Sequence, residues 1–282
     1  MKRVVWTTIG LGIVVLLVLI PAAMFGYSDG GEETYEPTRI TRYLADFDVA
    51  ADGEMTVTET LTVDFPIGGR HGIFRFWDVV DPNATTLRRE PRDVSVALDG
   101  QPEDFSMSTE DNGRYHVAKI GSEFRTLDVG EHTYVLRYTI DDALVETDGD
   151  GSQFYWNLIP GGWQQQIDQA RLTVTLPAEA GDVECAVGVG ETGGCTADGE
   201  GGTELVVKVQ DLDARTPVTV RTQLDLPVPE VQGPSRPWPA RFDPVLGGNV
   251  AVAVLTLLLA VGALAWAACS VPARGSRSRR TR

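Results

Sequence analysis

The sequence predicts a mainly β protein, an antiparallel β-sandwich outside the membrane with a hydrophobic helix near each end of the chain. Apolar and polar residues alternate with period two in a series of short runs between residues 27 and 226. Glycine, proline and aspartate separate these runs, as turns require. Apolar runs without a charge lie on either side of this region, at 4–20 and 250–268.

Residues 1–26 have the layout of a secretory signal. Lys2 and Arg3 precede the apolar run 4–20, and Pro21 and two alanines follow it. A basic start, an apolar stretch and a small-residue region together direct export. Because the run has 17 residues, it also suits an uncleaved membrane anchor. We therefore interpret residues 1–26 as a signal peptide or a signal anchor.

Residues 27–226 form the exported domain, built as one β unit or two. The pair Asp52 and Gly53 is a strong hairpin signal between the first two expected strands. No run in this region carries the 3.6-residue apolar stripe of a helix. Antiparallel layers are therefore expected. The expected strands are 40–49, 55–65, 92–100, 114–121, 132–140, 170–177, 203–210 and 215–226.

The C-terminal portion is predicted to tether this domain to a bilayer. Residues 227–244 hold six prolines in 18 positions and are expected to form an extended spacer. Residues 245–269 form the expected transmembrane helix, since their uncharged run nearly spans a hydrocarbon core of about 30 Å. The tail, 270–282, has five arginines and no acid, which favours the cytoplasm. The predicted location is the cell membrane, with one pass, or two if the N-terminal segment is uncleaved.

The charge of the chain restricts its partners. All 40 acidic residues lie between the two apolar segments, together with 17 of the 24 basic ones, so the exported portion has a formal charge of 17 minus 40, or −23. This charge repels nucleic acid and anionic headgroups, so no nucleic-acid partner is expected. The expected partners are the lipid bilayer and an unidentified envelope protein or glycan.

Two of the three cysteines, Cys185 and Cys195, fall in the exported portion. An even number of cysteines in an oxidising compartment predicts a disulfide between them. The alternative, a metal pair, lacks further Cys or His nearby, and the sequence indicates no metal site and no cofactor. The disulfide would close an 11-residue loop, worth about 3 kcal/mol in the chain-entropy model.

The stretch GGRHGIFRFWDV, residues 68–79, resembles an active site in composition. In the preceding expected strand, Glu59 shares the parity of the apolar residues and so faces the core. A buried carboxylate needs a partner, and we expect Arg75 or backbone N–H groups near Gly72 to provide it. The pair is interpreted as a structural clamp on the loop that includes His71. In the alternative interpretation Glu59 is a general acid with a raised pKa and His71 is its base or an electrophile.

Aromatic residues in the segment FYWNLIPGGWQQQI provide a candidate ligand platform: Tyr155, Trp156 and Trp163. Such side chains stack on sugar rings, and they also fill sandwich cores. The sequence of this segment is consistent with a sugar-binding platform and with a packed core.

An ordered series of motifs resembles a known family: DGEMTVTETLTVDF, HGIFR, FYWNLIPGGWQQQI, LTVTLP, and Cys185 with Gly188. Over residues 38–225 the chain is similar to the bacterial membrane-protein family named for domain of unknown function 2207. The resemblance implies an exported β-rich domain followed by a transmembrane helix, and no assigned activity. The sequence therefore predicts an envelope interaction or scaffold module rather than an enzyme; the alternative is a carbohydrate-binding or hydrolytic domain.

Overall fold

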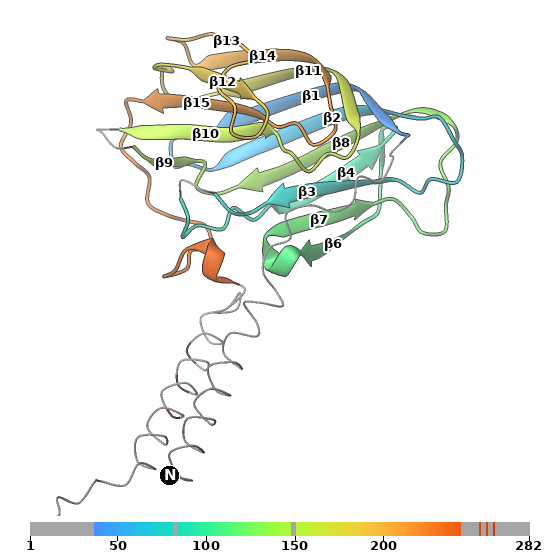
Figure 1. Ribbon diagram of the computed structural model, residues 1–282, viewed down its shortest axis with the longest axis horizontal. Helices are drawn as coiled ribbons and strands as arrows, with labels where there is room; N and C mark the ends of the chain where they lie inside the picture. Colours follow the sequence, from blue (N-terminus) through green and yellow to red (C-terminus); the bar gives the residue numbers. More distant parts are fainter. Residues whose placement is uncertain are drawn as a thin grey trace, which may run out of the picture. The chain divides into compact units, whose positions relative to one another are not determined.

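The computed structural model describes residues 37–81, 84–147 and 151–243, together with positions 254, 258 and 262 (Figure 1). The predicted signal or anchor 1–26, the tail 270–282 and most of the predicted helix 245–269 lie outside the described residues. In the part of the chain that is described, no helix is long and apolar enough to cross a membrane. The chain divides into two compact units, Gly30–Ala240, which holds all the strands, and the two ends, Met1–Asp29 and Arg241–Arg282.

The largest sheet has eight strands in the order β13-β14-β11-β1-β2-β8-β4-β5 (Figure 1). Its strands are β1 (Arg39–Val49), β2 (Met55–Phe65), β4 (Arg92–Leu98), β5 (Gln101–Pro102), β8 (Gly130–Ile140), β11 (Gln166–Thr175), β13 (Ala197–Asp198) and β14 (Glu204–Leu212). The predicted β1–β2 hairpin is confirmed. The expectation of purely antiparallel pairing is wrong for one pair, because β1 and β11 run parallel. The chain passes through the other sheets before it enters β11, and such a crossover is what parallel neighbours require.

Two smaller sheets complete the domain, in the orders β12-β15-β10-β9 and β3-β7-β6. Their strands are β3 (Ile73–Asp78), β6 (Phe105–Glu110), β7 (Tyr115–Ile120), β9 (Leu144–Glu146), β10 (Ser152–Ile159), β12 (Glu184–Val187) and β15 (Val218–Leu224); the 3-10 turns are η1 (Asp111–Gly113) and η2 (Ala240–Phe242). The sequence patterns did not predict β3 or β10. Both have large side chains on both faces, so their period-two alternation is weak.

One hydrophobic core joins the three sheets. Its buried side chains include Leu61 of the eight-stranded sheet, Phe154 of the β10 sheet and Trp77 of the β3 sheet. The side chains of β2 alternate as predicted, with Met55 and alternate residues through Phe65 buried. One of these buried positions, Glu59, carries a charge and lies on an interior strand of the largest sheet.

The proline-rich segment contacts the β-strand domain. The Asp142 carboxylate accepts hydrogen bonds of 2.9 Å from the backbone N–H groups of both Gln232 and Gly233. The backbone N–H of Arg88 donates to the Pro234 carbonyl, and that of Ala240 donates to the Thr85 carbonyl, each at 2.8 Å. The expected extended spacer is therefore held against the domain over residues 232–240, because its backbone groups find partners there.

A histidine–aspartate pair near the start of β8 predicts that the stability of the fold depends on pH. His132 Nδ1 lies 2.7 Å from Asp99 Oδ2. Desolvation has the largest effect on the pKa of His132 and would lower it, but the hydrogen bonds and charges of Asp99 and Asp128 together outweigh desolvation and raise this pKa above its usual value. A raised histidine pKa stabilises the fold below the ordinary value of about 6.5, and the contribution disappears as the pH rises through the folded-state pKa. We expect Asp99→Asn to lower the pKa of His132 in an NMR titration; an unchanged pKa would contradict the pairing.

Candidate ligand-binding cleft

The charged residue at the centre of β2 is Glu59, and it forms a buried ion pair with Arg75 of β3. Arg75 Nε donates to Glu59 Oε2 at 2.9 Å, and Arg75 Nη2 donates to Glu59 Oε1 at 2.6 Å. Tyr138 of β8 joins them, since its hydroxyl donates to Glu59 Oε1 at 2.7 Å and accepts from Arg75 Nη2 at 3.1 Å. The Glu59 side chain is 0% exposed and the Arg75 side chain 4%. The carboxylate thus has no access to solvent.

Aromatic rings surround the Arg75 guanidinium. Its central carbon lies 4.8 Å from the ring centroid of Trp77, 5.6 Å from that of Trp163 and 5.8 Å from that of Tyr138. Burial has the largest effect on the pKa of Arg75 and would lower it, but the charge and hydrogen bond of Glu59 together with Tyr138 and Tyr43 outweigh burial and raise this pKa. Burial and the same carboxylate raise the pKa of the Tyr138 hydroxyl. Arg75 therefore stays charged, and its rings and carboxylate hold it in place.

The structure does not bring His71 to Glu59. The His71 side chain is exposed, and its Nδ1 lies 2.9 Å from the carbonyl oxygen of Arg125 and 3.1 Å from that of Ser122. Gly72, next to it, approaches the backbone of β7, and a Cβ there would lie 1.8 Å from the Ile120 carbonyl oxygen. These two residues thus fix the loop before β3 and do not extend the Glu59 cluster.

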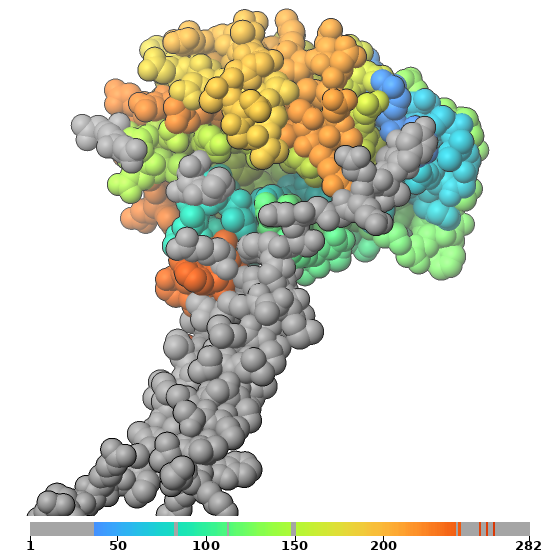
Figure 2. All heavy atoms as spheres, viewed as in Figure 1, coloured from blue at the N-terminus to red at the C-terminus, as the bar shows by residue number. Residues whose placement is uncertain are grey.

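A cavity of about 610 Å³ opens on the other side of Arg75. Figure 2 views the face on which the turquoise segment with β3 lies beside the yellow-green segment with β10, and both segments contribute to the cavity lining. Its aromatic lining consists of Phe76, Trp77, Tyr115, Tyr138, Tyr155 and Trp156; its charged lining consists of Arg75, Asp78, Asp81, Arg89, Arg114 and Arg215. We call this cavity the cleft. Its size is that of a small-molecule site.

The three residues of the candidate platform divide between cleft and core. Tyr155 and Trp156 are half-buried and line the cleft. Trp163 is 3% exposed and packs edge-on against Tyr43, with ring centroids 6.1 Å apart. Trp163 therefore belongs to the core beneath Arg75, and the two residues from β10 form the accessible part.

Arginine side chains supply most of the charge at the cleft. Arg114 Nη2 lies 3.0 Å from Asp78 Oδ2, and Arg89 is paired with Asp81. The Arg89 guanidinium also lies 4.8 Å from the ring centroid of Trp156. In the described part of the chain no group of three or more metal-ligating side chains is gathered. The arrangement offers cations and aromatic faces to a ligand.

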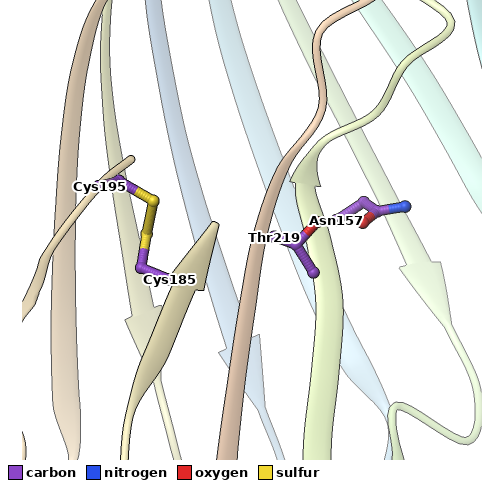
Figure 3. Close-up of a disulfide and its surroundings, with 4 residues drawn as sticks. All are labelled: Asn157, Cys185, Cys195 and Thr219. Atoms are coloured by element: carbon purple, nitrogen blue, oxygen red, sulfur yellow. Dashed lines mark hydrogen bonds between the residues drawn. A yellow bond between two sulfur atoms is a disulfide. The ribbon is translucent and has the colours of Figure 1, made fainter. Parts of the chain in front are cut away.

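The disulfide between Cys185 and Cys195 is present (Figure 3). Gly188 and Gly190 of the loop between the two cysteines line the cleft, and the Gly188 N–H donates to the Pro217 carbonyl at 2.9 Å. On the neighbouring strands β10 and β15, Thr219 Oγ1 donates to Asn157 Oδ1 at 2.7 Å (Figure 3). The disulfide therefore restrains one wall of the cleft.

Replacing both cysteines by serine is expected to lower the free energy of unfolding by up to about 3 kcal/mol, since the unfolded chain gains the freedom of the opened loop. The eight-stranded sheet contains neither cysteine, so circular dichroism should keep its β signature. Denaturant unfolding of the full chain in detergent, with and without reductant, measures the loss. A variant that is as stable as the reduced wild type supports the assignment; a variant that matches the oxidised wild type contradicts it.

Sequence reasoning missed several residues of the cleft. Tyr138 shares the buried parity of β8, and a buried hydroxyl needs a partner, which is a usable signal. Arg89 lies in a polar run that reads as a loop, and Arg114 and Arg215 lie at strand ends far from β10 in sequence. Nothing in the local pattern indicates that these arginines meet.

Comparisons with known proteins give low-identity structural matches. An M1 zinc metallopeptidase from Deinococcus radiodurans is 15% identical with a TM-score of 0.36, over 65% of this chain and 42% of that chain. Leukotriene A4 hydrolase from Saccharomyces cerevisiae is 11% identical with a TM-score of 0.41, over 72% of this chain and 32% of that chain. This chain thus spans less than half the length of these structures, and a likeness at this level says nothing of its activity.

No curated protein matches the chain. The family model described as the N-terminal domain of a predicted membrane protein, domain of unknown function 2207, matches residues 39–224. That range agrees with the range over which the sequence motifs resemble the family, so the resemblance is confirmed. The chain belongs to the family of predicted membrane proteins named for domain of unknown function 2207.

Proposed function

We propose that this protein is a membrane-anchored recognition module of the cell envelope, whose extracytoplasmic β-sandwich binds a ligand in the cleft. Residues 1–26 direct export, the helix 245–269 holds the chain in the bilayer, and the tail 270–282 stays in the cytoplasm. The observation that carries the proposal is the cleft of about 610 Å³, lined by Tyr155 and Trp156 together with arginine side chains. Concave sites with aromatic walls and a few polar groups are typical of ligand binding.

The burial of Glu59 favours binding over hydrolysis. A general acid must reach the substrate to transfer a proton, and the Glu59 side chain is 0% exposed. Both of its oxygens accept hydrogen bonds from Arg75, and His71 bonds elsewhere. The burial and the hydrogen bonds of Glu59 therefore support its proposed role in a structural clamp, in which Glu59 holds Arg75 at the base of the cleft.

Binding of purified envelope polysaccharides to the full chain in detergent tests the cleft. We expect at least one polysaccharide to bind and Trp156→Ala to weaken it about tenfold, because a stacking face is lost. Phe124→Ala is the matched control, since Phe124 is 99% exposed and does not line the cleft. Equal losses in the two variants, or no loss in Trp156→Ala, would refute binding in the cleft.

The anchoring is tested by labelling of an introduced thiol. In a variant that combines Cys269→Ser with Ser278→Cys, residue 278 carries the free thiol of the predicted cytoplasmic tail. An impermeant maleimide is expected to label this thiol only after the membrane of spheroplasts is opened. Labelling in intact spheroplasts would place the tail outside and contradict the proposed orientation.

A further inference from the structure

We propose that the cleft binds a sugar residue that carries one anionic group, a carboxylate or a phosphate. The sugar ring lies against Trp156 and Tyr155, and Arg89 holds the anionic group. This inference rests on the proposed function of the cleft as a binding site, and it names the chemistry of the ligand.

The charge of the cleft is opposite to that of the rest of the exported portion. Arginines that line it are Arg75, Arg89, Arg114 and Arg215, and carboxylates that line it are Asp78 and Asp81. Glu59 lies behind Arg75 and compensates that charge. The exported portion as a whole has a formal charge of 17 minus 40, or −23. A local excess of cations in such a domain attracts an anionic group to this place.

Arg89 is a buried cation with an unused donor. The residue is 6% exposed, its Nε donates to the Asp142 carbonyl at 3.1 Å, and it is paired with Asp81. Its Nη2 is buried and has no hydrogen-bond partner among the residues that the structure describes. Burial lowers the pKa of Arg89, because desolvation outweighs the attraction of Asp81 and Asp142. A guanidinium that is incompletely compensated in this way gains from a further anion.

The neighbouring rings define where the sugar lies. The Arg89 guanidinium is 4.8 Å from the ring centroid of Trp156, and Trp156 and Tyr155 are half-buried residues of the cleft lining. Apolar faces of a sugar pack on such rings, and a guanidinium binds carboxylate or phosphate oxygens. Because Nη2 is itself buried, binding requires a rotation of the Arg89 side chain toward the ligand.

The total charge limits how many anionic groups the ligand carries. A long polyanion would meet the field of a domain of charge −23 outside the cleft and would be repelled. A single anionic sugar would lie inside the cleft and would interact mainly with the residues that line it. A volume of about 610 Å³ suits a ligand of this size.

Calorimetric titration of the full chain in detergent tests the inference with three probes: D-glucuronate, glucose 6-phosphate and D-glucose. These share one ring and differ in the anionic group, so the two charged probes distinguish carboxylate from phosphate. At least one charged probe is expected to bind tenfold or more tightly than glucose, and 0.5 M NaCl should reduce that ratio. Equal affinities for all three probes would overturn the inference.

Charge-removing variants locate the anion. Arg89→Gln is expected to reduce the affinity for the charged probe to that for glucose. Because Arg89 is buried and this variant risks misfolding, the exposed Arg215→Gln provides a second test, with an expected loss of about threefold for the charged probe alone. Arg171→Gln is the matched control, since Arg171 is exposed on β11 and does not line the cleft. Equal effects of Arg215→Gln and Arg171→Gln would overturn the inference.

The outcomes separate this inference from the proposed function. If glucuronate, glucose 6-phosphate and glucose bind equally and Trp156→Ala weakens all three, the cleft is a binding site and the anionic preference is wrong. If none of the three binds, the inference is wrong as well, and the polysaccharide test with Trp156→Ala decides the proposed function by itself.

Discussion

Glu59→Gln is expected to lower the free energy of unfolding by about 3 to 5 kcal/mol, because it leaves the Arg75 guanidinium buried and uncompensated. Arg75→Met should have a similar effect through the unpaired Glu59 carboxylate, whose side chain is 0% exposed. Denaturant unfolding of the full chain in detergent, followed by tryptophan fluorescence, measures both losses.

An exposed ion pair of the same residue types is the control for these variants. Arg92 Nη2 lies 3.0 Å from Glu54 Oε2, and both side chains are nearly half exposed, at 44% and 45%. Solvent screens such a pair, so Glu54→Gln should change the free energy of unfolding by less than about 1 kcal/mol. If Glu59→Gln changed stability as little as Glu54→Gln does, the clamp would be refuted, and Glu59 would again be a candidate for chemistry.

The second large effect is expected at Gly72. A Cβ at this position would lie 1.8 Å from the Ile120 carbonyl oxygen and 2.9 Å from its carbonyl carbon. Backbone atoms cannot move aside as a flexible side chain does, so Gly72→Ala must push β3 away from β7. We expect a loss of about 3 kcal/mol or more in the free energy of unfolding, from overpacking combined with backbone strain.

Gly69 in the same loop separates overpacking from loss of backbone freedom. It has a φ of +88°, and no atom lies within 4 Å of a Cβ built there. Gly69→Ala should therefore cost only the strain of a left-handed conformation, about 1 to 2 kcal/mol. Chemical denaturation of the two variants side by side gives the comparison, and equal losses would show that the contact with Ile120 does not matter.

Much of the fold was predictable because the eight-stranded sheet buries one face. Its strands follow period two closely, as in β2, where alternate residues from Met55 to Phe65 are buried. β3 and β10 were not predicted because large aromatic residues occupy neighbouring positions, Phe76 and Trp77 in β3 and Tyr155 and Trp156 in β10, so the residue types do not alternate, although the burial of β3 does. The parallel partner of β1 was also missed, since pairing between strands distant in sequence leaves no local pattern.

One part of the candidate site, the need of Glu59 for a partner, was predictable because the pattern of a single strand indicates it. A charge among the apolar residues of β2 requires a partner, and this pointed from Glu59 to Arg75 or to backbone N–H groups near Gly72; in the structure the partner is Arg75. The cleft required more, because Trp156, Arg89 and Arg215 come from three distant segments. Whether these residues lie together depends on how the smaller sheets pack, and the residue types and their spacing along the chain do not indicate this packing.

The double variant Glu59→Gln with Arg75→Met is the most direct test of the central claim, that these residues are one structural unit at the base of a binding cleft. Denaturant unfolding of the wild type, both single variants and the double variant gives the coupling free energy. The account predicts that the double variant loses no more stability than either single variant, because removing both charges leaves neither unpaired. Losses that add would show that the two residues act independently and would contradict the account.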